Sequence, residues 1–142
     1  MPEHVATETS VNYIVQLEKI TCLRQSEEIS SEAVKGLSAR ILCEGIWTTV
    51  IPVEWASGWV MDGNHRLNVA RHLGLTHLPV VRLRYDDPRV SVLRWDNETP
   101  YPTTQISAEI ARRVLLPFKT TKHRFSPLLP EVRISLNELR IG

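Results

Sequence analysis

Hydrophobic residues recur at two different spacings along the chain, which predicts a domain that mixes helices and strands. Residues 30–43 have apolar side chains every three or four positions, as expected for one buried helix face. These positions are Ala33, Val34, Leu37, Ile41 and Leu42. Ser30 or Ser31 can cap the start of this helix, and Gly45 can end it.

Two further helices are predicted. Residues 64–73 place Leu67, Val69, Ala70 and Leu73 on an inward face, and Gly74 ends the pattern. Residues 107–116 form the third helix, with Ser107 as its cap and a proline after it.

Runs of β-branched and aromatic residues predict strands at 13–22, 47–53, 59–61, 78–85 and 90–95. The last stretch alternates weakly at Val132, Ile134 and Leu136. Together the elements predict an α+β fold, a compact domain with a small mixed sheet and flanking helices.

Length and composition restrict the class of protein. The chain has 142 residues, of which 42% are hydrophobic and 23% charged, as in an ordinary globular protein. We expect a loose N-terminal arm at 1–10 and one domain at 11–142. With 17 basic and 16 acidic residues the net charge is +1, which makes nucleic acid an unfavoured partner.

The chain shows neither a signal peptide nor an apolar run of transmembrane length, so we expect a cytoplasmic protein without a membrane partner. Cys22 and Cys43 lie among apolar neighbours and lack metal-binding spacing. We expect both to be reduced and mostly buried.

The stretch 60–67, VMDGNHRL, carries the clearest chemical signal. It predicts a strand that turns at Gly63 into the first turn of a helix, where backbone N–H groups and the helix dipole attract anions. Arg66 adds a planar fork of donors that suits phosphate oxygens. Asp62 would repel such an anion unless a divalent cation lies between them, which favours bound Mg²⁺. Taken alone, the pattern also fits a structural turn in which Asp62 merely caps the helix.

The stretch 51–85 resembles the core of the ParB/sulfiredoxin superfamily, in which a D-G-H-H-R loop after a strand holds nucleotide phosphates. Asn64 replaces the first histidine of that loop. Sulfiredoxin activity would need a cysteine in the loop, and residues 62–66 contain none, so this activity is not expected. The DNA-partitioning proteins carry a further helix-turn-helix module, for which the chain after Tyr85 is too short, so DNA partitioning is disfavoured.

Three segments are similar to the free L-serine kinases of this superfamily. LRQSEEI at 23–29 resembles their L-x-P-H-E segment, and PFKTTKH at 117–123 resembles their P-P-K-T-T-R-H motif. The third is the loop 62–66. The departures are Gln25 and Ser26 for Pro-His, and Lys122 for arginine.

The resemblance implies transfer of a phosphoryl group from ADP or ATP to free L-serine or a related hydroxy amino acid, with Mg²⁺ as cofactor. Glu27 is the implied base, with Glu28 as the alternative, and Asp62 and His65 complete the catalytic set, with Asp62 holding the metal. The implied phosphate-binding residues are Gly63, Asn64, His65, Arg66, Thr120, Thr121, Lys122 and His123. Trp95, Lys122 and His123 are the implied contacts of the amino acid.

Two other functions remain open. One is a nucleotide-binding ParB-like regulator without catalysis, for which a base at Glu27 would have no use. The other is a DNA-associated relative, which would gather its basic residues on one face and bind in a salt-dependent way. Those basic residues are Arg112, Arg113, Lys119, Lys122 and Arg124.

Overall fold

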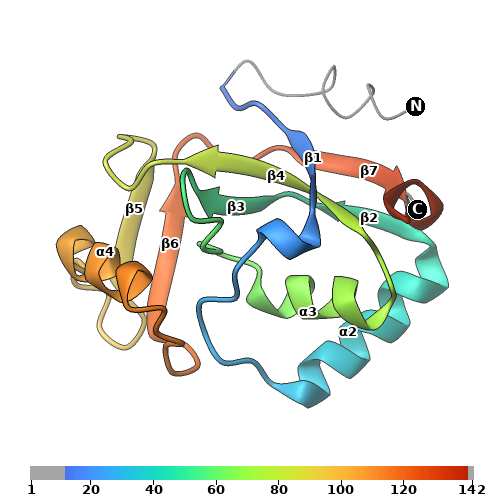
Figure 1. The fold of residues 1–142 in the computed structure, drawn as a ribbon, viewed down its shortest axis with the longest axis horizontal. Helices are drawn as coiled ribbons and strands as arrows, with labels where there is room; N and C mark the ends of the chain where they lie inside the picture. Colours follow the sequence, from blue (N-terminus) through green and yellow to red (C-terminus); the bar gives the residue numbers. More distant parts are fainter. Residues whose placement is uncertain (1–11, 141–142) are drawn as a thin grey trace.

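A three-stranded sheet of mixed direction forms the centre of the fold. The computed structural model describes residues 12–140 (Figure 1), so the predicted arm at 1–10 lies outside the described residues. Strand β4 (His77–Leu83) is the middle strand, antiparallel to β1 (Gln16–Lys19) and parallel to β3 (Ile51–Glu54). Helices, a mixed sheet and two smaller sheets confirm the α+β prediction.

Helices α2 (Ser31–Glu44) and α3 (Asn64–His72) pack against each other on one side of this sheet (Figure 1). The predicted caps of α2 are confirmed, because the Ser30 side chain accepts the N–H of Ala33 and Gly45 adopts a left-handed φ of 72°. The predicted inward face of α2 is partly wrong. Ala33 and Leu42 are exposed, and the buried positions are Val34, Ser38 and Ile41.

The predicted strand at 47–53 is two strands that belong to different sheets. Strand β2 (Ile46–Thr49) pairs antiparallel with β7 (Glu131–Ser135), whereas β3 joins the central sheet. The register of β2 shifts between Trp47 and Thr49, and Val50 separates the two strands. The alternation of Val132 and Ile134 lies on β7, where both are buried, and Leu136 begins the short 3-10 helix η2 (Leu136–Leu139).

The third helix, α4 (Thr103–Ala111), begins and ends earlier than the predicted 107–116. Pro102 precedes its first turn, no side chain caps it, and Ser107 lies inside it. Arg113 has a φ of 56° just after the helix, and the chain then turns so that Leu116 forms an isolated parallel bridge with Glu27. Helix α4 packs near the antiparallel pair β5 (Val90–Arg94) and β6 (Thr121–Phe125) (Figure 1).

Two predicted segments near the N-terminal half are shorter in the structure. The strand at 13–22 is regular only at 16–19 and continues as the 3-10 helix η1 (Ile20–Cys22). Trp59 and Val60 form single bridges, to Arg24 and Val53 respectively, rather than a strand. Both cysteines are free but exposed, which corrects the expected burial: one ends η1 and the other lies in the last turn of α2.

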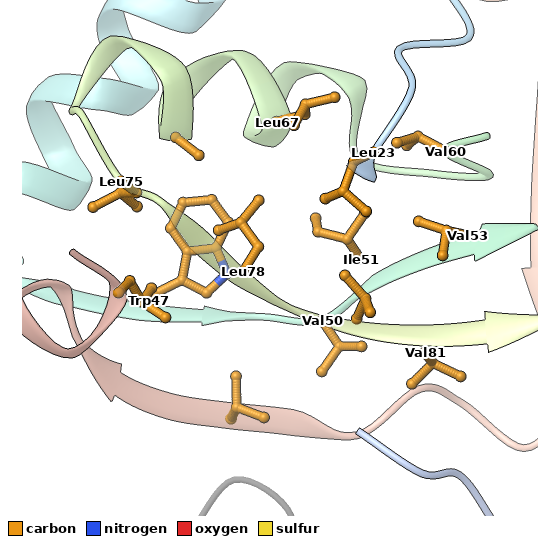
Figure 2. Close-up of a cluster of buried hydrophobic side chains, with 14 of the residues drawn as sticks. Leu23, Trp47, Val50, Ile51, Val53, Val60, Leu67, Leu75, Leu78 and Val81 are labelled. Atoms are coloured by element: carbon orange, nitrogen blue, oxygen red, sulfur yellow. The ribbon is translucent and has the colours of Figure 1, made fainter. Parts of the chain in front are cut away.

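The main core lies between α3 and the sheets. Figure 2 shows Trp47 and Leu78 beneath the helix, with Leu67 above Ile51 and Val53. A second cluster joins Trp59, Val92, Tyr101, Ile106 and Leu116 under α4. Between β3 and α3, Trp59 belongs to the second cluster, and Val60 and Met61 belong to the main core. Both clusters therefore hold this segment, which fixes the turn that leads into α3.

Candidate active site

A cavity of about 530 Å³ opens at the N-terminal end of α3. It brings together all but one of the predicted site residues, from four separate parts of the chain. They are Glu27, Asp62, Gly63, Asn64, His65, Arg66, Trp95, Thr121, Lys122 and His123. The exception is Thr120, whose hydroxyl donates to the carbonyl of Pro117 over 2.6 Å.

Gly63 allows the turn that opens α3. Its φ of 106° lies in the region that favours glycine, and a Cβ added there would approach Ile51 Cδ1 to 2.8 Å. As the N-cap it offers no side-chain bond to the helix. The first N–H groups of α3 have no acceptor within the helix, so they are available at the cavity for an anion.

Asp62 and Arg66 bring opposite charges to this end of the cavity. The Asp62 side chain is exposed, yet protein atoms around its carboxyl displace water and raise its pKa, while the Gly63 amide and Arg66 act against this shift. Burial and the nearby Arg40 lower the pKa of Arg66. Within residues 12–140 Arg66 forms no ion pair at 4 Å or less, so its guanidinium can meet a phosphate.

The side chain of Asn64 is engaged with Ser26. Its Oδ1 accepts the Ser26 N–H over 2.7 Å, and its Nδ2 donates to Ser26 Oγ over 3.1 Å. Ser26 is buried, with 3% of its surface exposed, and its hydroxyl also donates to the Val60 carbonyl. Ser26, which departs from the kinase segment, and Asn64, which departs from the D-G-H-H-R loop, are therefore in contact, and they fix the segment that carries Glu27.

His65 links the start of α3 to the start of α2. Its Nε2 accepts the backbone N–H of Ser30 over 3.0 Å, and its ring meets the edge of Phe118 at 5.6 Å between centroids. Burial lowers its pKa, with Glu27 acting in the opposite direction. Since a backbone N–H can only donate, the proton of the neutral ring lies on Nδ1.

Glu27 is held by the C-terminal segment of the chain. Its Oε2 accepts both the N–H of Thr121, over 3.0 Å, and the Thr121 hydroxyl. Among residues 12–140, no hydrogen-bond partner is found for its Oε1. Glu28 also lines the cavity but is exposed, and its side chain makes no such bond to the described residues.

Two of the five basic residues named as a possible DNA-binding face pair with one acidic residue. Lys122 and Arg124 lie on strand β6, and Glu98 binds both Lys122, over 3.0 Å, and Arg124, over 2.8 Å. The ammonium of Lys122 also lies 5.1 Å from the ring centre of Trp95. One acidic residue thus compensates two of the five cations that a DNA-binding face would need.

The cavity lining includes apolar residues that sequence reasoning missed. Leu37, Val50 and Met61 line it, together with Thr49. No local motif marks these residues, because three distant elements bring them together. Phe118 and Lys119 also line the cavity, and their position inside the quoted PFKTTKH segment was the signal that could have identified them.

Several features limit what the site can hold. Among the described residues there is no group of three or more His, Cys, Asp or Glu side chains that could bind a metal. Neither cysteine lines the cavity, so it offers no thiol.

The helices in the described part of the chain are all too short or too polar to cross a membrane.

Comparison with known proteins places the fold. No protein-family model and no curated protein sequence matches the chain. Among solved structures, a free serine kinase in complex with AMP superposes with a TM-score of 0.70 at 13% identity, covering 88% of this chain and 93% of that one. SbnI with a C-terminal truncation, from Staphylococcus aureus, gives 0.72 at 12% identity, covering 97% of this chain and 91% of that one.

A conserved hypothetical protein from Pyrococcus furiosus is also similar, with a TM-score of 0.69, 12% identity, and coverage of 88% of this chain and 97% of that one. Other structures of the free serine kinase, in which a glutamate is substituted, hold ADP or AMP. The chain therefore has the predicted ParB/sulfiredoxin-like fold, in the form that these serine kinase structures share.

Proposed function

We propose that this protein is a kinase that transfers a phosphoryl group from ADP or ATP to the hydroxyl of free L-serine. The observation that supports this most is that Glu27 and the uncapped N-terminus of α3 line one cavity. A carboxylate poised beside an anion-binding helix end supplies the two elements that phosphoryl transfer to a hydroxyl requires.

The nucleotide phosphates bind at the first turn of α3. Backbone N–H groups around Gly63 and Asn64 donate to their oxygens, and Arg66 adds a charged fork. Thr121, Lys122 and the ring of His65 approach from the other walls. Asp62 fits Mg²⁺, because this ion is commonly held by one carboxylate together with phosphates and water, and it would neutralise charge on the phosphates.

Glu27 acts as the general base. The bond from the serine oxygen to phosphorus forms as the bond to the departing nucleotide breaks, and the serine proton passes to Glu27. Thr121 occupies Oε2, which leaves Oε1 to receive this proton. Glu28 lacks such an anchor, so Glu27 is the better candidate of the two.

Serine recognition falls to Trp95, which follows β5, and to residues of β6. Trp95 provides an aromatic surface of which 41% is exposed, and Lys122 lies over it. The serine carboxylate is met by Lys122 or His123, both of which line the cavity.

The test is to incubate the purified protein with Mg²⁺, L-serine and either ADP or ATP, and to follow O-phospho-L-serine by phosphorus NMR. Product with one nucleotide supports the kinase and identifies its donor. Nucleotide binding without product from serine, threonine or homoserine would refute it and leave a nucleotide-binding regulator.

A further inference from the structure

His123 has one polar atom that the rest of the protein leaves unpaired. The residue lies on β6 two positions after Thr121, so both side chains point to the same side of the strand, and both line the cavity. Its Nδ1 is buried and has no hydrogen-bond partner within residues 12–140. Such an atom is costly unless a ligand satisfies it.

The other ring nitrogen is held by Tyr85. The Tyr85 hydroxyl lies 2.9 Å from Nε2, and the rings are 5.7 Å apart between centroids. Among residues 12–140 no other acceptor is found for this hydroxyl. The single hydrogen of the phenol is therefore directed to Nε2 of His123.

This arrangement determines where the imidazole proton lies. Because Nε2 accepts a hydrogen bond, the proton of the neutral ring is on Nδ1. Burial lowers the pKa of His123 to about 3, so the ring is neutral at physiological pH. The unpaired atom is therefore a donor, an N–H without an acceptor.

We propose that Tyr85 is a positioning residue that fixes His123 as the Nδ1–H tautomer, so that His123 donates a hydrogen bond to an anionic oxygen of the bound ligand. That oxygen belongs either to the amino-acid carboxylate or to a nucleotide phosphate. The identity of the ligand rests on the proposed function, but the tautomer does not.

The tautomer is measured on full-length protein labelled with ¹⁵N-histidine, by long-range proton–nitrogen correlation of the ring. We expect His123 Nδ1 to have the shift of a protonated nitrogen and Nε2 that of an unprotonated one. In Tyr85→Phe the Nε2 resonance moves toward the protonated shift. The matched control is Tyr101→Phe, because Tyr101 also packs in the cluster under α4 but bonds to Glu109 rather than to His123.

Ligand arms with L-serine alone, ADP alone and Mg²⁺–ADP show which oxygen is bound. One of them should shift His123 Nδ1 in wild type, and its Kd should rise about 3- to 10-fold in Tyr85→Phe and remain unchanged in Tyr101→Phe. Protonated Nε2 in wild type, an unchanged ring in Tyr85→Phe, or no response of Nδ1 to any ligand would overturn the proposal. Absence of phosphoserine with the tautomer as expected would refute only the kinase.

Discussion

Replacing Asn64 by alanine removes the acceptor for a buried backbone N–H. Ser26 N donates to Asn64 Oδ1 over 2.7 Å, and only 3% of the Ser26 surface is exposed, so water does not readily replace this acceptor. A buried donor left unsatisfied costs about 1–3 kcal/mol. We expect Asn64→Ala to lower the free energy of unfolding by about 2 kcal/mol and the Tm by about 5 °C.

Urea unfolding followed by tryptophan fluorescence measures this loss, with two matched variants. Asn68 lies one turn later on α3 and donates to Gln25 Oε1 over 3.0 Å, where water can substitute, so Asn68→Ala should cost less than about 0.5 kcal/mol. Asn64→Asp keeps an acceptor for Ser26 and should recover most of the stability. Its added negative charge should weaken nucleotide binding.

The contrary result would be that Asn64→Ala unfolds at the wild-type urea midpoint but loses nucleotide affinity. The Asn64 amide would then act on the phosphates rather than on Ser26. That outcome would restore the role that the resemblance implies and refute the reasoning from burial.

Three further predictions concern the same cavity. Gly63→Ala should destabilise the fold by more than about 1 kcal/mol and abolish nucleotide binding, because the φ of Gly63 is 106°. The control is Gly36→Ala, in open space within α2, which should stabilise the fold by about 0.5–1 kcal/mol. Thermal unfolding measures both effects on stability. Thr121→Val should lower kcat at least about 10-fold, because it removes one of the two hydrogen bonds that hold Glu27. Thr120→Val should leave steady-state kinetics near wild type. The pKa of Asp62 is raised in the folded protein, so ionisation of this carboxyl lowers stability as pH rises through that pKa. Asp62→Asn should therefore raise the Tm at pH 7. Isothermal titration calorimetry of the same variant should show loss of Mg²⁺-dependent nucleotide binding.

Local signals in the sequence predicted the helices better than the strands. The caps Ser30 and Gly45 act within one turn of α2, so sequence alone was enough to locate that helix. The break at Val50 depends on partners far along the chain, since β2 pairs with β7 and β3 with β4. The start of α4 was missed because a serine within the helix resembles a cap, whereas the helix begins after Pro102.

The candidate site was predictable as a set of residues but not as a geometry. The resemblance suggested Glu27 and Thr121, which are 94 positions apart, and only the fold shows that they are hydrogen-bonded. Asn64 and His65 were expected to face phosphates, yet their side chains bond to Ser26 and Ser30. Such contacts depend on how α2 and α3 pack together, which no local pattern encodes.

The most direct test of the proposed mechanism compares Glu27→Ala with Glu28→Ala in the phosphoserine assay. A general base contributes about 10²- to 10⁴-fold, so Glu27→Ala should lower kcat by at least about 10²-fold with the Kd of the nucleotide unchanged. Glu28→Ala should retain kcat within about 5-fold, since its side chain has no anchor in the described structure. Wild-type turnover by Glu27→Ala, or its loss in Glu28→Ala alone, would contradict the assignment of Glu27 as the base.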